Sequence, residues 1–100
     1  MIAKVIWTEQ ALSDLDIIYE FLSINSTKVS EKIIYDILNR IAQLECNPLS
    51  VQVELQLKLN YTYRYIVEGN YKIIYRFENN IVFINTVFDT RQNPKKLIIK

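Results

Sequence analysis

Residues 62–94 read TYRYIVEGNYKIIYRFENNIVFINTVFDTRQNP, and this stretch decides the fold. It holds three runs rich in Tyr, Ile, Val and Phe, separated by Glu68–Asn70 and by Glu78–Asn80. The glycine and asparagines of these separators tolerate the positive φ angles of tight hairpin turns. The pattern therefore predicts a three-stranded antiparallel meander.

Alternation along the second run separates apolar side chains from cations. One face of this predicted strand carries Tyr71, Ile73, Tyr75 and Phe77, and the other carries Lys72, Ile74 and Arg76. A three-residue loop over Glu68–Asn70 would add Arg64 and Ile66 to the Lys72 face, and Tyr63, Tyr65 and Val67 to the aromatic face.

A two-residue turn at Asn79 and Asn80 extends the same reasoning to the third run. It would place Phe83, Asn85 and Val87 beside Lys72 and Arg76, and would leave Val82, Ile84 and Phe88 with the core. The predicted sheet then has one aromatic side and one basic side, and a shift of one residue in register would invert the assignment.

Length and composition indicate one ordered domain over residues 1–100. Half of the residues are apolar, 23% are charged, and glycine and proline together number three. The longest apolar runs are three or four residues, which predicts neither a transmembrane span nor a signal peptide. Cys46 is the single cysteine and cannot form an internal disulfide. A cytoplasmic protein without a membrane association is therefore expected.

The charge of the chain is unevenly distributed. The net charge is +1, but residues 1–50 hold four Lys or Arg and seven Asp or Glu, whereas residues 51–100 hold eight and four. The acidic excess falls on predicted helices and the basic excess on the predicted sheet and tail. This polarity indicates either an anionic partner for the basic side or simply a soluble surface.

The first half of the chain predicts a strand and two helices. Ala3–Trp7 has the composition of a short strand, and Thr8 is a candidate helix N-cap. That helix should end near Asn25, and a second, capped by Ser26 or Thr27, should end at Asn47-Pro48. Residues 51–59 alternate like a strand, although a surface loop would also fit. The order β-α-α-β-β-β predicts an α+β domain, with an antiparallel helix hairpin on one face of a small antiparallel sheet.

Several chemistries are excluded by composition. The chain has no histidine, one cysteine and one glycine, so we expect no metal site, no cofactor and no phosphate-binding glycine loop. What remains is a set of candidate binding residues on and beside the sheet: Arg64, Lys72, Arg76, Asn85 and Arg91. Such cations could hold phosphates, with aromatic side chains stacking on bases, or could bind a carboxylate-rich protein. A solvated basic face is the alternative.

The whole chain resembles the RelE/ParE superfamily of toxins from bacterial type II toxin–antitoxin (plasmid stabilisation) systems. The similarity is cumulative along the sequence. It comprises Trp7-Thr8, Ala11, Asp14-Leu15, Asn47-Pro48, Tyr63-Arg64, the run Gly69 to Tyr75 and the run Val87 to Pro94. The fold implied by the resemblance agrees with the predicted order of elements.

The resemblance implies two different activities. RelE-like members are ribosome-dependent mRNA endonucleases, and Arg64, Lys72 and Arg91 fall at or near their catalytic or phosphate-binding cations. The catalytic histidine of several such members has no counterpart, although Tyr71, Tyr75 or Asp89 could substitute. ParE-like members poison DNA gyrase without a nuclease site, and we expect this activity.

A third hypothesis is a degenerate, inert module that only binds an antitoxin. For an active toxin the resemblance implies a cognate antitoxin, either gyrase or the ribosome with its mRNA as target, and homo-oligomers built through the toxin–antitoxin complex. In the predicted register Lys72 lies between Arg64 and Arg76, which makes it the candidate for proton transfer if the chain is a nuclease.

Overall fold

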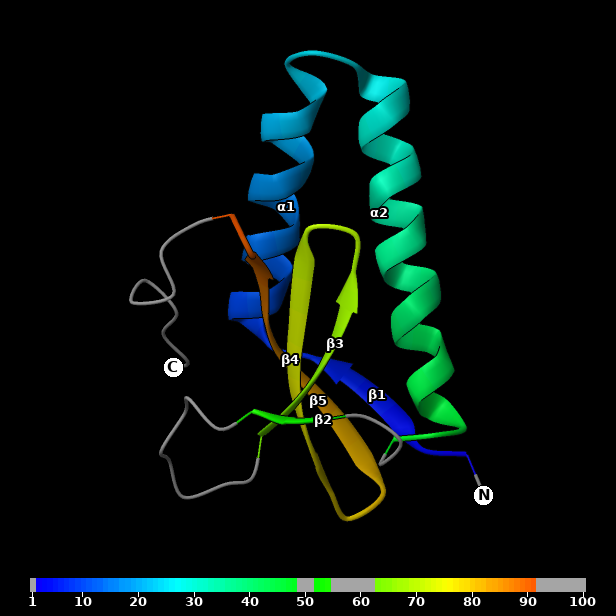
Figure 1. Ribbon diagram of the computed structural model, residues 1–100. Helices are drawn as coiled ribbons and strands as arrows, with labels where there is room; N and C mark the ends of the chain where they lie inside the picture. The colour runs from blue at the N-terminus through cyan, green and yellow to red at the C-terminus, as the bar shows by residue number, and fades with distance from the viewer. Residues whose placement is uncertain (1, 49–51, 55–62, 92–100) are drawn as a thin grey trace.

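The computed structural model describes residues 2–48, 52–54 and 63–91. The elements along the chain are β1 (Lys4–Trp7), α1 (Glu9–Ser23), α2 (Thr27–Ala42), a short 3₁₀ turn (Gln43–Glu45), β2 (Gln52–Glu54), β3 (Tyr63–Glu68), β4 (Tyr71–Glu78) and β5 (Ile81–Asp89). The two helices form an antiparallel hairpin whose tip projects beyond the end of the sheet (Figure 1). The predicted α+β architecture is confirmed.

The sheet is mixed rather than wholly antiparallel. Its strand order is β1-β5-β4-β3-β2, and the only parallel pair in the described sheet is β1 with β5. Because the helix hairpin separates β1 from β2 in the sequence, β1 can pair with the distant strand β5 instead of with β2. Residues 52–54 of the alternating segment form the edge strand β2, which confirms that part of the strand alternative, whereas the rest of 51–59 lies outside the described residues.

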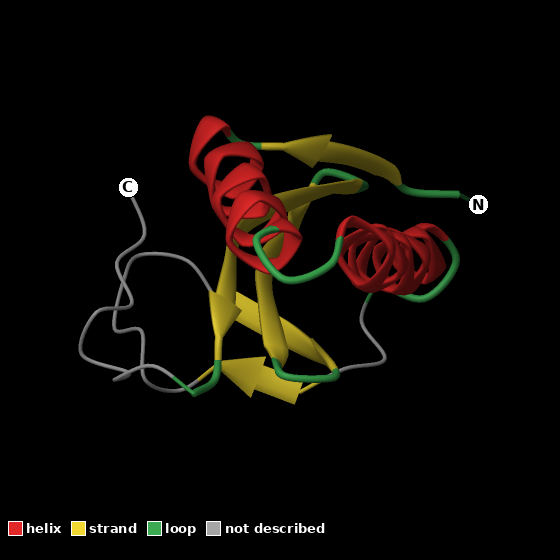
Figure 2. Cartoon of the chain, turned by 90° about the horizontal axis from the view of Figure 1, so that it is seen from above, coloured by secondary structure: helices red, strands yellow, loops and turns green. Residues whose placement is uncertain are grey.

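Both helices begin at the predicted caps. The Thr8 hydroxyl oxygen accepts a hydrogen bond from the Ala11 amide, and the Ser26 hydroxyl oxygen accepts one from Val29, both at 3.2 Å. Ser30 is completely buried where the helices cross, and its hydroxyl donates to the Tyr19 carbonyl at 3.0 Å. A small side chain at this position lets the two helix backbones approach closely. Figure 2 shows the hairpin from its tip, with the helices side by side.

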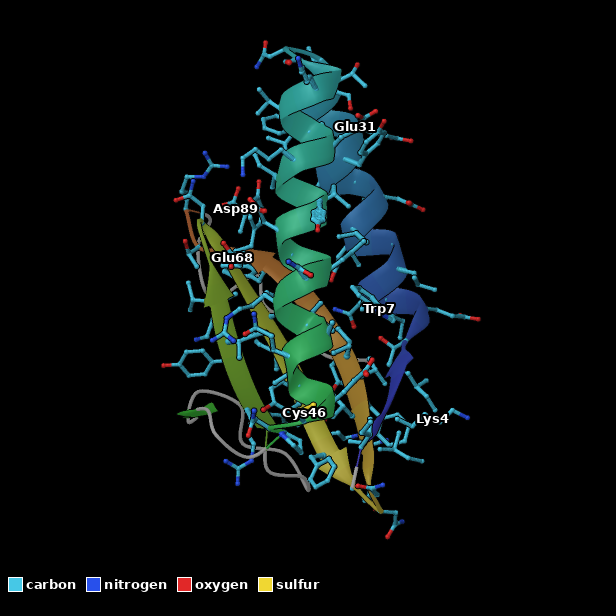
Figure 3. The ribbon with its side chains drawn as sticks, turned by 90° about the vertical axis from the view of Figure 1, so that its right-hand side faces the viewer. Lys4, Trp7, Glu31, Cys46, Glu68 and Asp89 are labelled. Carbon is cyan, nitrogen blue, oxygen red and sulfur yellow. The ribbon has the colours of Figure 1, made fainter. Side chains whose placement is uncertain are left out.

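The hydrophobic core lies between the hairpin and one face of the sheet, as the view in Figure 3 shows. The β4 residues predicted to face the core do so: Tyr71, Ile73 and Tyr75 belong to the core cluster, and Phe77 packs against it. The helices, the 3₁₀ turn and the other strands contribute Ala11, Ile37, Ile41, Leu44, Ile66, Val82, Ile84 and Val87. Removal of this apolar surface from water is the main stabilising contribution to the domain.

The predicted register of β3 is wrong by one residue. Glu68 pairs with Tyr71, so the loop between the strands contains two residues, Gly69 (φ +59°) and Asn70, rather than three. Every β3 side chain therefore changes face. Ile66 pairs with Ile73 in the core, and Arg64, Tyr63, Tyr65 and Val67 are also on the opposite face from the one predicted.

The turn between β4 and β5 is as predicted, but a bulge follows it. Asn79 (φ 51°) and Asn80 (φ 61°) form the two-residue turn, and Val82 and Ile84 face the core. Farther along, the register shifts between Ile74 and Tyr75, and no β4 residue pairs with Asn85. Because of this extra residue, Val87 joins the core opposite Ile73 and Phe88 pairs with Lys72, the reverse of the prediction.

Residues from the start of α1 complete the edge of β5 where β1 ends. The Thr8 amide and hydroxyl both donate to the Ile84 carbonyl, at 3.1 and 2.8 Å, and the hydroxyl also donates to the Asn85 carbonyl. The Asp14 carboxylate accepts from the Thr86 hydroxyl at 2.6 Å and from the Val87 amide at 3.1 Å. Thr8 and Asp14 thus bond to polar groups of β5 that lie beyond the end of β1.

Candidate functional site

Two of the predicted cations share the face of the sheet that points away from the helices. The Lys72 ammonium lies 4.2 Å from the ring centroid of Tyr65, and the Arg76 guanidinium lies 4.3 Å from that of Phe83. Arg76 also forms an ion pair with Glu78. Both contacts follow from the register, since each aromatic residue is on a neighbouring strand and on the same face. We call Tyr65, Lys72, Arg76 and Phe83 the outer platform.

Arg64 lies on the other face of the sheet. It pairs across the strands with Tyr75, whose side chain is completely buried and whose hydroxyl donates to the Pro48 carbonyl. The charges of Arg64 and of Arg40, from the last turn of α2, both act on this phenol. Arg40 also donates to the Gln43 side chain at 2.9 Å. The structure therefore associates Arg64 with Arg40 rather than with Lys72.

Arg91 occupies a third location, just after β5 ends. Its Nε and Nη2 both donate to the Asp89 carboxylate, at 2.9 and 2.8 Å, in a bidentate ion pair. Tyr71, the cross-strand partner of Asp89, lies beside this pair. Glu68 and Asp89 lie at the same end of the sheet in Figure 3, below the hairpin tip.

Asn85, the remaining candidate binding residue, is the extra residue of the β5 bulge. It is only 6% exposed, and its side-chain oxygen has no hydrogen-bond partner within the described part of the chain. Its backbone carbonyl accepts from Thr8. An orphaned buried acceptor is unusual in folded proteins, but Asn85 is not part of an open basic surface.

The predicted cationic cluster is thus divided among three locations. Lys72 and Arg76 share the outer platform, Arg64 lies on the helix side, and Arg91 lies at the far end of β5. The prediction that Arg64 flanks Lys72 is wrong because it depended on a three-residue loop before Tyr71. Among the described residues, no group of three or more His, Cys, Asp or Glu could hold a metal ion, and no helix is long and apolar enough to cross a membrane.

The residues that could replace a catalytic histidine all have pKa values displaced away from neutrality. Burial raises the pKa of Tyr75 to about 12, although the charges of Arg64 and Arg40 oppose the shift. Burial and the charge of Asp89 raise the pKa of Tyr71. Hydrogen bonds from Arg91 hold the pKa of Asp89 below its ordinary value. A general acid or base acts best with a pKa near the working pH, and the shifts at all three residues are in the opposite direction.

An apolar surface lies on α1, beside the end of the sheet where β4 begins and β5 ends. Ile17 and Phe21 on α1 are 62% and 63% exposed, and with Ile18 they line a pocket of 290 Å³ whose other walls are Tyr71, Asp89 and Arg91. Large apolar side chains gathered at the surface commonly mark interaction sites. The signal was present in the sequence: α1 has more apolar residues than one helix face can bury.

The fold is shared with a chain of a solved toxin–antitoxin system. A solved structure of a chromosomal ParDE toxin–antitoxin system from P. aeruginosa aligns with 88% of this chain and 96% of its own, at 17% sequence identity and a TM-score of 0.72. At this identity the likeness concerns the fold alone. No curated protein is similar enough in sequence to match.

The family follows from the sequence itself. Residues 5–94 match the family described as the ParE toxin of the type II toxin–antitoxin system, parDE. Because the match spans most of the chain, the protein belongs to the ParE toxin family, and membership implies an antitoxin as partner.

Proposed function

We propose that this protein inhibits DNA gyrase in the cytoplasm and is neutralised by a cognate antitoxin. Membership of the ParE family over residues 5–94 is the observation that carries this proposal. The geometry of the candidate site supports it by making the alternative, an mRNA nuclease, chemically difficult.

Cleavage of RNA by its own 2′-hydroxyl requires a base, an acid and a cation that stabilises the phosphorane. The described structure separates these requirements. Lys72 and Arg64 lie on opposite faces of the sheet, so one phosphate could not contact both. The Tyr75 hydroxyl is engaged with the Pro48 carbonyl, and Asp89 is held in its ion pair with Arg91.

The outer platform is the best candidate for contact with an anionic surface of the target or of its bound DNA. Lys72 and Arg76 are spaced along one strand, with aromatic rings beside each. Cations in such a row can contact successive charged groups on a macromolecule without any reaction taking place.

Brief induction of the toxin without its antitoxin tests the proposal. We expect intact mRNA 5′ ends, replication arrest and DNA-damage signalling, and we expect purified toxin to inhibit supercoiling by gyrase. Codon-phased mRNA cuts that disappear in Lys72→Ala would refute gyrase as the target and establish the nuclease. Unimpaired growth, with the toxin folded and abundant, would instead support the inert module.

A further inference from the structure

The apolar surface on α1 extends beyond the pocket, to the end of the helix. Ile17, Phe21 and the C-cap residue Ile24 follow one another at positions i, i+4 and i+7, so they lie on one face over about 10 Å. Their exposed fractions are 62%, 63% and 79%. We call these three residues the α1 patch. A group that covered it would remove three large apolar side chains from water, which favours binding.

The border of the α1 patch is acidic. Glu20 is three residues from Ile17 and four from Ile24, so it lies beside both on the helix surface. Asp16 lies one turn before Glu20, and neither carboxylate belongs to an ion pair within the described part of the chain. Residues 5–27 contain no Lys or Arg, so α1 cannot neutralise these charges itself. A covering group therefore gains from positive charge next to its apolar side chains.

This charge disfavours three kinds of occupant. A second copy of the chain, docked patch to patch, would bring two acidic borders together, and like charges across an interface weaken binding. Anionic lipid headgroups and nucleic acid would be repelled for the same reason. A short segment that combines apolar side chains with lysines satisfies both the patch and its border.

The chain itself contains such a segment next to the patch. Residues 95–100 read KKLIIK, three apolar residues bracketed by three lysines. They lie outside the described residues, but Arg91, the last residue that the structure describes, lines the pocket together with Ile17 and Phe21. Leu97 follows Arg91 by six residues, and an extended chain of that length spans up to about 20 Å. The segment is therefore tethered at the pocket and is long enough to reach the whole patch.

The spacing of the apolar residues fits as well. In an extended chain alternate side chains face the same side, about 7 Å apart, so Leu97 and Ile99 face one side and Ile98 faces the other. Ile17 and Phe21 are four residues apart on a helix, which is about 6 Å along its axis. Two side chains of the segment can therefore contact two side chains of the patch in one arrangement.

We propose that residues 95–100 fold back onto the α1 patch of the same chain. Leu97 and Ile99 pack against the patch, and the lysines of the segment face Asp16 and Glu20. The docked segment covers the apolar surface in the free chain, so a partner that uses the α1 patch must first displace it. This docking does not depend on whether gyrase is the target.

Nuclear magnetic resonance of the isotopically labelled full chain, separated from its antitoxin and refolded, tests the proposal. We expect nuclear Overhauser effects between the Phe21 ring and the methyl groups of Leu97 and Ile99. Leu97→Ser with Ile99→Ser should remove them and lower the ratio of docked to free segment, read from the Phe21 ring shifts, by about 10-fold or more. Ile98→Ser is the matched control and should change this ratio by less than about 3-fold. The dispersion of the amide spectrum confirms that each variant is folded.

Charge reversal supplies the second measurement. Asp16→Lys with Glu20→Lys should release the segment at low salt, with backbone order parameters of residues 95–100 falling below about 0.6. The difference from wild type should shrink at high salt, because added ions screen the attraction that the substitutions remove. Glu31→Lys is the control, since Glu31 is exposed on α2 and lines a different pocket, and it should leave the order parameters unchanged.

Two results would overturn the docking. One is a wild-type chain without these Overhauser effects, whose Phe21 ring shifts equal those of the Leu97→Ser, Ile99→Ser variant. The other is the appearance of the same effects between differently labelled copies in a mixed sample, which would assign the contact to two molecules. Either result leaves the proposed function intact, because no measurement here involves gyrase or the antitoxin.

Discussion

Replacing Asp14 with alanine should lower the free energy of unfolding by about 3 kcal/mol. The Asp14 carboxylate accepts two hydrogen bonds from β5, one from the Thr86 hydroxyl and one from the Val87 amide. Hydrogen bonds to charged groups contribute roughly 1.5–3 kcal/mol each, and a buried donor left without an acceptor costs about 1–3 kcal/mol. Thr86 and Val87 are only 3% and 4% exposed, so water cannot readily replace the carboxylate.

Urea unfolding followed by far-ultraviolet circular dichroism measures this loss on toxin that has been separated from its antitoxin and refolded. For a domain of this length, about 3 kcal/mol corresponds to a decrease in Tm of roughly 12–24 °C. Asp16→Ala is the matched control, because Asp16 lies on the same helix but is exposed, and it should stay within about 0.5 kcal/mol of wild type.

A double-mutant cycle assigns the effect to the contact itself. Thr86→Val keeps the shape of the side chain and removes the hydroxyl, and its cost should fall by about 1 kcal/mol when Asp14 is already alanine. The reasoning is refuted if Asp14→Ala costs no more than Asp16→Ala, or if the two substitutions are strictly additive.

Three further predictions concern the core, the cations and the helix crossing. Because the pKa of Tyr75 is raised to about 12, the folded state keeps the phenol proton between pH 10 and about 12, whereas the unfolded state loses it. The free energy of unfolding should therefore fall by up to about 2 kcal/mol as the pH rises through this window. Tyr75→Phe should remove this part of the pH dependence of urea unfolding. Arg91→Ala should reduce toxicity in a growth assay while changing the Tm by only a few degrees, because the ion pair of Arg91 is exposed. Arg64→Ala should also reduce toxicity. A large decrease in the Tm of either variant would show a structural role instead. Ser30→Leu should destabilise the domain by about 1–3 kcal/mol, because a completely buried serine at the helix crossing leaves no room for a larger side chain, and an unchanged urea midpoint would contradict this packing.

The parts of the fold that depend on local sequence were predictable. The hydroxyls of Thr8 and Ser26 accept hydrogen bonds from amides only three residues later in the chain. The caps could therefore be predicted from the local sequence alone. The turn at Asn79 and Asn80 is equally local, since both residues adopt positive φ. Alternation within β4 correctly identified its core face, because the extra residue of the bulge belongs to β5 and not to β4.

The register between neighbouring strands was not predictable in the same way, because it depends on whether the loop that joins them has an even or an odd number of residues. Either two or three residues of Glu68–Asn70 can form the hairpin loop. The number decides whether Arg64 lies on the same face of the sheet as Lys72 or on the opposite face. The bulge at Asn85 has no sequence signal of its own. It is stabilised by Thr8 and Asp14, more than 70 residues earlier in the chain.

The structural role of Thr8 and Asp14 explains why they are part of the similarity to RelE/ParE toxins. Both residues belong to the similarity with RelE/ParE toxins, and in this chain both hold the edge of β5. Thr8 and Asp14 stabilise the fold, so their presence does not distinguish a nuclease from a gyrase poison. The distinction depends on proton transfer, for which the sequence offered Lys72 and, in place of a histidine, Tyr71, Tyr75 or Asp89. Burial or ion pairing moves the pKa values of Tyr71, Tyr75 and Asp89 away from neutrality, which supports the proposal of a toxin that binds its target rather than cleaving it.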